Sequence, residues 1–485
     1  MEGDEFNLSA MAVIQGSGLN IEQHPINGMN YIIIRRVPFF TEFMSVLNPL
    51  FGGDIYASRR AMIFFKTITL FLLFILAFQK FGFWAACFVV PLYAASAYRM
   101  SSTVLGYEIN LTETLAIIVL FIMFGTSPKK LYFKILRIST ISTLLIVLIY
   151  TYNVAYFFVF LCYFYLYVYE FYFKKNLIEK CSNIIILVLP LVLNFHRFIN
   201  IIIDDIHGKQ YLLNRTVLSV QQPMTWTTYL EKIDDQWQMA LRGIWQGNIL
   251  KDYVYPFEGA LVPHVLVVLA VAGIILAGIK RKFIFLNLIA PFHFIVMHVL
   301  IGLETARIWA FTIFGLALSA ISLMGHIKIP KTKNVNLVLA ISLIPFLWCT
   351  QLAMEKNWAL IVEGLRIRSS DNTIQINLLD FLHQNKQLTT VSTKEEYINA
   401  QIILVHKIYH IEKGTPKEEI DKLGTENLHT YDETNLEKAM NSIFTSPENI
   451  FVTRNFLKQH IHGENRDIFL NSYTEYFNNF IYFHT

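Results

Sequence analysis

The sequence predicts a polytopic α-helical membrane protein, because three features of its composition agree. Of its 485 residues 54% are apolar and only 16% are charged, and the mean hydropathy is +0.44. Apolar runs of about 20 residues, the length that a helix needs to cross a bilayer, recur along the first 354 positions. Aromatic residues make up 15% of the chain, which suits helices that face lipid. This composition excludes fibrous proteins and gives no sign of a nucleic-acid partner.

Runs of about 20 mostly apolar residues predict transmembrane helices. The ten candidates are 60–79, 81–98, 111–126, 138–152, 154–172, 182–203, 261–279, 283–302, 308–326 and 335–352.

The orientation follows from the basic residues of the connecting loops, because Lys and Arg stay on the cytoplasmic side. Ten helices place four basic loops on one face: Lys129 to Arg137, Lys174 to Lys180, Lys280 to Lys282 and Lys328 to Lys333. The opposite, extracytoplasmic face then receives the large polar segments.

This orientation places the first 58 residues outside, which requires a signal that carries them across the membrane. The segment Met1 to Glu5 is acidic, whereas a signal peptide begins with basic residues. We therefore expect a further helix before Met1, which would bring the total to 11.

The predicted domains follow the change in composition. Residues 1–354 form the transmembrane module, with 1–58 as the first outer loop and 204–260 as a large outer loop of amphipathic helices. Residues 355–485 carry 13 Lys and Arg against 18 Asp and Glu, and they read as a small soluble α/β domain on the extracytoplasmic side. Short apolar runs at 389–391, 402–405 and 450–452 are its expected strands.

An adjacent acidic pair opens the chain just before an apolar stretch with helical spacing. Asp4 and Glu5 precede Phe6 to Ile14. Carboxylates at a helix start are favoured by the helix dipole, and one held near a membrane surface can act as a general base toward a hydroxyl or amine. An exposed acidic N-terminus is the plainer interpretation of the same residues.

Several short motifs follow one another after this pair. They are Gln15–Gly18, His24–Pro25, Leu50–Gly53, Ala57–Met62, Tyr98–Arg99 and Glu108–Leu115, with Glu304–Trp309 much later. In this order they resemble the GT-C glycosyltransferases of the protein O-mannosyltransferase and lipid A aminoarabinose-transferase type. The resemblance covers residues 1–330 in architecture and about 1–125 in motif.

The resemblance implies a sugar donor on polyprenyl phosphate, used at the outer membrane face. Asp4 would be the base, and Glu5 would position the acceptor or an ion, so that a divalent cation stays an open question and no other cofactor is implied. The candidate donor-phosphate partners are Arg59, Arg60, Arg99, Arg307 and His24. Arginine suits this role because its fork matches phosphate oxygens, although an arginine at a helix end can also anchor in the interface.

The acidic residue of the second outer loop has two candidates. Glu108 precedes the predicted helix at 111–126 and is slightly favoured, whereas Glu113 lies in the first turn, where an ionised group is costly unless it is functional or paired.

The predicted function is an integral-membrane glycosyltransferase of the plasma (inner) membrane, with its active site on the extracytoplasmic side. It would move a sugar from a polyprenyl-phosphate donor to a lipid A, glycan or protein acceptor. A polysaccharide polymerase or ligase is the alternative among enzymes. A transporter or flippase of lipid-linked sugars is the alternative from another class, disfavoured because the helix centres are nearly free of charge and the two halves show no repeat.

Overall fold

The structure is a computed structural model. It describes residues 3–19, 38–103, 108–125, 130–173, 177–194, 226–246, 261–300, 309–327, 332–372, 379, 389–393, 396–422, 428–431, 450–453, 475–477 and 480–483. The chain forms two compact units, one of Met1–Ile34, Thr41–Ala61 and Leu365–Thr485, the other of Arg35–Phe40 and Met62–Gly364.

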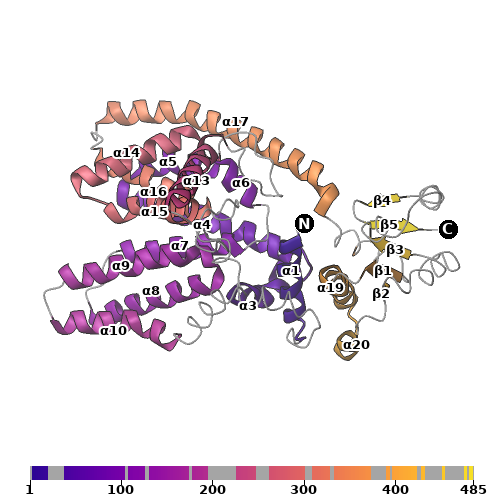
Figure 1. Ribbon diagram of the computed structural model, residues 1–485. Coiled ribbons are helices and arrows are strands. Elements are labelled where there is room, and N and C mark those ends of the chain that lie inside the picture. Colours follow the sequence, from indigo (N-terminus) through magenta and orange to yellow (C-terminus); the bar gives the residue numbers. More distant parts are fainter. Residues whose placement is uncertain are drawn as a thin grey trace. The chain divides into compact units, whose positions relative to one another are not determined.

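Helices account for the described part of the larger unit (Figure 1). They are α4 (Ala57–Phe81, starting in the smaller unit), α5 (Phe83–Ala94), α6 (Ala97–Thr103), α7 (Glu108–Phe124), α8 (Leu131–Thr151), η3 (Asn153–Ala155), α9 (Tyr156–Phe173), α10 (Leu177–Leu193), α13 (Trp226–Gln246), α14 (His264–Lys280), α15 (Ile284–His293), the π-helical η4 (Phe294–Leu300), α16 (Trp309–His326) and α17 (Lys333–Asn372).

Each of the ten predicted apolar segments overlaps one of these helices. Among the described residues, four helices are long and apolar enough to cross a membrane: Ala57–Phe81, Tyr132–Thr151, Trp309–His326 and Asn334–Ala359. Five further apolar helices are shorter. The helical, membrane-type fold is therefore as expected, whereas the number of crossings stays a prediction.

Helix α16 is the centre of the larger unit, with nearly every side chain buried. It packs against α14 and α15 through glycines. A Cβ added at Gly273 would lie 2.2 Å from the carbonyl oxygen of Ser319, and one at Gly315 would lie 2.5 Å from the backbone nitrogen of Ala290. The absent side chains let these backbones approach closely, as small residues do in membrane helices.

Helices α7, α8, α9 and α10 form a second group, in which α8 packs against the other three. Many outward side chains of this group are apolar, for example Phe164 on α9 and Val192 on α10, which are 58% and 61% exposed. Such a surface suits contact with lipid rather than water.

Helix α17 is the longest helix of the described chain, with 40 residues. Its first half lies beside α5, where Phe346 stacks edge-on against Phe88 with ring centroids 5.0 Å apart. Its Asn357 donates a hydrogen bond to the carbonyl of Ala95 at 2.9 Å. The helix continues through the predicted domain boundary at residue 354, so the division into 1–354 and 355–485 stays a prediction.

The amphipathic helix expected in the large outer loop is α13. Ala240, Gly243 and Ile244 are buried, while Asp234 and Asp235 are exposed, so one face packs and the other meets solvent or headgroups. The packed face lies against η4 and the start of α16. The other residues of 204–260 lie outside the described part.

The smaller unit combines the start and the end of the chain. Helix α1 (Gly3–Gly16) packs against α19 (Glu396–Glu412). The remaining elements are α3 (Pro38–Leu47, shared with the larger unit), η2 (Asn48–Phe51), α20 (Lys417–Lys422), β1 (Thr389–Thr393), β2 (Leu428–Tyr431), β3 (Ile450–Thr453), β4 (Glu475–Phe477) and β5 (Phe480–Phe483).

The strands form one sheet in the order β2-β1-β3-β5-β4. The pairs β1/β2 and β1/β3 are parallel, and β3/β5 and β4/β5 are antiparallel. Strands occur at two of the three runs expected to form them, but residues 402–405 lie within α19. Leu404, Val405, Ile408 and Tyr409 are apolar at the spacing of one helix face, and they are buried together with His406 and Lys407 between them.

Candidate functional site

The acidic pair lies where the sequence placed it, in the first turn of a helix. Asp4 and Glu5 belong to α1, which begins at Gly3 and ends at Gly16. Their side chains, His24 and Arg307 lie outside what the structure describes. The pair belongs to the smaller compact unit, so its role as general base stays a prediction.

The two arginines at the start of α4 differ in their surroundings. Arg60 is exposed, forms an ion pair with Asp54 and donates from Nε to the carbonyl of Phe51. These bonds brace the turn at Gly52, which has a φ of 107° and whose added Cβ would meet the guanidinium at 2.6 Å. Arg60 is thus a turn-bracing residue as well as a candidate phosphate partner. Arg59 is half-buried.

Two predicted site residues, Arg99 and Glu113, form a direct ion pair in the larger unit. One nitrogen of the Arg99 guanidinium donates to Oε2 of Glu113, and Nη2 donates to the backbone carbonyl of Lys66 at 2.8 Å. Lys66 itself reaches the same Oε2 with its Nζ at 2.7 Å. The three residues are the buried cluster.

Four helices supply and support the buried cluster. Lys66 comes from α4, Arg99 from α6 and Glu113 from α7, while Tyr93 of α5 donates its hydroxyl to Glu113 at 3.4 Å. Ser102, one turn after Arg99, accepts a hydrogen bond from Lys66 Nζ at 3.0 Å.

The pairing of α4 with α7 is also fixed beside the buried cluster, at Thr69, one turn after Lys66, and at Thr114, the residue after Glu113. The hydroxyls of Thr69 and Thr114 lie 2.8 Å apart, and Thr114 also donates to the carbonyl of Phe65 at 3.0 Å. Such bonds between apolar helices hold Lys66 opposite Glu113.

The buried cluster combines unequal numbers of formal positive and negative charges away from the protein surface. Lys66 and Arg99 are 1% exposed and Glu113 is 0% exposed. Among these three side chains, two formal positive charges face one formal negative charge. All donors go to Oε2 of Glu113, whereas its buried Oε1 has no hydrogen-bond partner within the described residues. An excess of formal positive charge favours binding of an anionic group, whereas the unused acceptor atom favours a hydrogen-bond donor such as a hydroxyl.

Glu108 is the other acidic candidate of the second outer loop. It begins α7 and is 2% exposed, and its carbonyl accepts a hydrogen bond from Thr112. It precedes Glu113 by five positions, which turns the two side chains about 140° apart around the helix. Of the two candidates in the second outer loop, the structure brings Glu113 to the predicted phosphate-binding Arg99.

The sequence interpretation missed Lys66, because the run 60–79 was treated as uncharged. Lys66 is the seventh residue of the predicted run 60–79. An ionisable group within a membrane helix is costly unless it is paired or functional, so this lysine could have been recognised as a candidate site residue. The description of the helix centres as nearly free of charge was therefore incomplete.

A second buried polar group lies where α15 continues into η4, against α16. Nδ1 of His293 is 2.9 Å from the hydroxyl of Thr312, which is 3.3 Å from Nε2 of His298. The ring of His298 stacks on Trp309 with centroids 3.8 Å apart. In the described part of the chain, no three His, Cys, Asp or Glu residues are grouped to hold a metal ion.

Comparison with known proteins gives similarity in structure rather than in sequence. No family model and no curated protein matches the sequence. ArnT from Cupriavidus metallidurans in the apo state matches with a TM-score of 0.54 and 9% identity, over 99% of this chain and 92% of that chain. ArnT from the same organism bound to undecaprenyl phosphate matches with a TM-score of 0.52 and 10% identity, over 100% and 94%. The chain therefore has an ArnT-like membrane fold, and the GT-C resemblance is confirmed at the level of the fold.

Proposed function

We propose that this protein is an integral-membrane glycosyltransferase of the GT-C type that takes its sugar from a polyprenyl-phosphate donor. The observation that carries the proposal is the buried cluster of Lys66, Arg99 and Glu113 within an ArnT-like fold. ArnT binds undecaprenyl phosphate, a lipid of the proposed donor class. A formal surplus of positive charge among apolar helices is the electrostatic feature that a phosphate leaving group needs.

Within this proposal, Lys66 and Arg99 stabilise the charge that builds up on the donor phosphate as the glycosidic bond breaks. The arginine fork suits two phosphate oxygens, and lysine adds a point charge. Glu113 holds the two cations together through Oε2. Its second oxygen, Oε1, can accept a hydrogen bond from a substrate hydroxyl.

Asp4 stays our proposed general base, and Glu5 the residue that positions the acceptor or a divalent cation. Arg59, Arg60, Arg307 and His24 stay candidate donor contacts, and Glu108 stays the alternative acidic residue. The acceptor is lipid A, another glycan or a protein, on the extracytoplasmic face of the inner membrane.

A transporter of lipid-linked sugars is the second candidate. The sequence disfavoured it because the helix centres are nearly free of charge, whereas the buried cluster places charged residues within the helices. Paired ionisable groups within membrane helices also mark transport pathways. A polysaccharide polymerase or ligase is the alternative enzyme, for which we would expect several arginines in one outer loop.

One experiment separates the classes. Purified protein in detergent is incubated with a radiolabelled polyprenyl-phosphate sugar and a mixture of envelope lipids, glycans and proteins. A transferase releases polyprenyl phosphate and labels an acceptor without a sealed membrane, whereas a transporter leaves the donor intact. An unchanged donor across several sugars, with protein shown to be folded, would contradict the proposal.

A further inference from the structure

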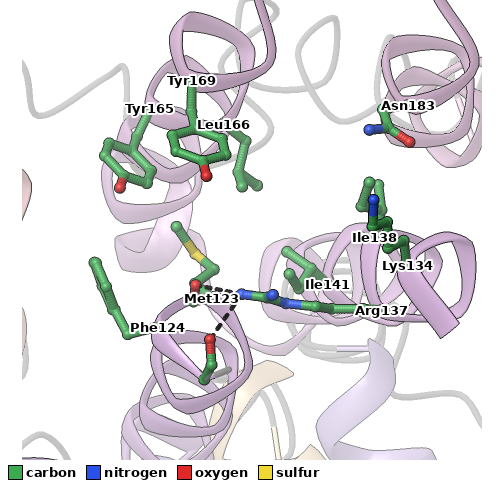
Figure 2. Close-up of a pocket in the computed structure, with 11 residues that line it drawn as sticks. Met123, Phe124, Lys134, Arg137, Ile138, Ile141, Tyr165, Leu166, Tyr169 and Asn183 are labelled. Atoms are coloured by element: carbon green, nitrogen blue, oxygen red, sulfur yellow. Dashed lines mark hydrogen bonds between the residues drawn. The ribbon is translucent and has the colours of Figure 1, made fainter. Parts of the chain in front are cut away.

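A pocket of about 210 Å³ lies between α7, α8, α9 and α10, and an arginine forms part of its wall (Figure 2). Arg137 of α8 donates from Nε to the carbonyl of Ile122 at 3.0 Å and from Nη2 to that of Met123 at 2.6 Å. These carbonyls lie in the last turn of α7, so Arg137 joins the end of α7 to α8. The bonds give Arg137 a structural role. The features of a ligand surface lie on another helix, α13.

Helix α13 packs closely against its neighbours in the larger unit (Figure 1). Gly243 lies against Trp309 at the start of α16, because an added Cβ would be 3.0 Å from the indole ring. Near the C-terminal end of α13, the carbonyl of Trp245 lies 3.1 Å from Nε2 of His264, the first residue of α14. The exposed face of α13 is therefore held in a defined position within this unit.

Two tryptophans on α13 are partly exposed, and each contacts an aromatic ring of another helix. Trp237 and Trp245 are 41% and 44% exposed. Trp237 packs edge-on against Phe294 of η4 with ring centroids 5.6 Å apart, and the ring of Trp245 lies 4.8 Å from that of His264. These contacts restrict the two indoles while much of each side chain stays accessible.

The two indoles belong to one strip of the helix surface. Trp245 follows Trp237 by eight positions, which is about 12 Å along the helix axis and about 80° around it. Leu241 lies between them and is 37% exposed. A strip of this length suits a ligand made of a few linked rings better than one compact small molecule.

Exposed polar side chains accompany this strip. Asp234, Asp235, Gln238 and Arg242 are exposed, and Nε2 of Gln238 donates to Oδ2 of Asp234 at 2.9 Å. Carboxylate, amide and guanidinium groups can bond to several hydroxyls at once, and an indole offers a flat apolar surface to the C–H groups of a sugar ring. The combination suits a saccharide.

The charges of α13 disfavour a purely membrane-anchoring role. The helix contains three acidic and two basic residues. Helices that lie on an anionic membrane surface typically have a polar face rich in Lys and Arg, which α13 lacks.

We propose that the exposed face of α13 binds the saccharide part of the acceptor. Trp237 and Trp245 stack on sugar rings, and Asp234 and Asp235 accept hydrogen bonds from sugar hydroxyls. The acceptor is then a glycan or a glycolipid rather than a protein. Saccharide binding stands on the geometry of α13, whereas its assignment to the acceptor rests on the proposed function.

The test measures binding of neutral trisaccharides to the full chain in detergent, with no donor present. Trisaccharides of glucose, mannose, galactose and N-acetylglucosamine are titrated by saturation-transfer NMR. At least one should bind, and Trp237→Leu and Trp245→Leu should each weaken its binding about tenfold, the upper range for one aromatic contact. The matched control is Trp358→Leu, which removes a tryptophan of α17 that is 48% exposed and should leave binding unchanged.

Several results would overturn the proposal. They are no binding of any of the four trisaccharides by folded protein, unchanged binding in the α13 variants, or an equal loss in Trp358→Leu. Asp235→Asn is a further variant of the same face, should a tryptophan variant fail to fold, and it should also weaken binding.

A second measurement addresses the membrane alternative. In nanodiscs whose phospholipids are brominated near the headgroup, the fluorescence that Trp245→Leu removes should not be quenched. Strong quenching would make the strip a membrane anchor and overturn the proposal. Donor release in detergent is measured separately, so a failure of saccharide binding is distinguishable from a failure of the proposed function.

Discussion

Replacing Lys66 should show whether the buried cluster serves the reaction or only the stability of the fold. Lys66→Met removes the surplus charge and leaves Arg99 and Glu113 as a neutral pair. Exchanging a buried ion for an apolar side chain of similar size is often neutral or stabilising. Glu113→Gln instead leaves two cations buried together at 1% exposure. Breaking a buried pair in this way costs about 3–5 kcal/mol.

The effects on transfer should follow a different order. If Lys66 stabilises charge on the donor phosphate, Lys66→Met should lower the rate by about 100- to 1,000-fold, as the loss of one electrostatic contact to a transition state does. Glu113→Gln should lower the rate as well, but together with stability. The pattern to look for is a Lys66→Met protein that is stable and nearly inactive.

Two measurements on each variant decide the matter. Thermal unfolding in detergent gives the stability, and release of polyprenyl phosphate from a labelled donor gives the rate. Lys80→Met, at the exposed end of the same helix, is the control for lysine loss. If Lys66→Met unfolds as early as Glu113→Gln, the cluster is a structural lock between α4 and α7. If it is stable and fully active, Lys66 does not assist the reaction.

Three further predictions test the base, the topology and the packing. Asp4→Asn should slow transfer by about 100- to 10,000-fold, and Glu5→Gln should slow it less; an unimpaired Asp4→Asn enzyme would exclude Asp4 as the base. A single cysteine at Lys130 should resist an impermeant thiol reagent in intact cells, and ready labelling would reverse the predicted orientation. Gly273→Ala should lower the unfolding temperature because its Cβ would meet the Ser319 carbonyl, whereas Gly278→Ala on the same helix meets no atom within 4 Å and should be tolerated or slightly stabilising. Equal behaviour of the two glycine variants would argue against the packing of α14 on α16.

The positions of the helices could be predicted because apolar composition is a local property. Each of the ten apolar runs overlaps a helix, and the amphipathic α13 lies within 204–260, where amphipathic helices were expected. The details that depend on tertiary contacts could not be read. Pro291 in α15 is followed by the π-helical turn η4, and only the packing of η4 against α13 shows why this irregular segment is accommodated.

The same limit explains the helix at 402–405. Four consecutive apolar residues fit a strand and a helix equally well. The choice depends on Ile408 and Tyr409, which repeat the apolar pair Leu404 and Val405 one helical turn later.

In the candidate site, the sequence indicates individual residues but not the contacts between them. Arg99 and Glu113 stood out separately, since each is an ionisable residue close to a predicted membrane helix. Their partnership with Lys66 spans 47 residues and depends on α4 lying beside α7, which the Thr69–Thr114 contact fixes. Lys66 lies within the apolar run 60–79, and the run as a whole still predicts a membrane helix. An ionisable residue inside such a run is nevertheless the strongest single signal of this site.

The pairing also changes what phosphate binding would require. Arg99 already donates hydrogen bonds to the carboxylate of Glu113 and to the carbonyl of Lys66. Its guanidinium is therefore paired before any donor binds. An approaching phosphate would compete with Oε2 of Glu113 for the same donors. If the donor binds here, Glu113 must give up part of its hydrogen bonding to Lys66 and Arg99 as the phosphate arrives. Glu113 would then help to set donor affinity, and Glu113→Asp, which keeps the charge but shortens the reach, should alter KM for the donor more than kcat.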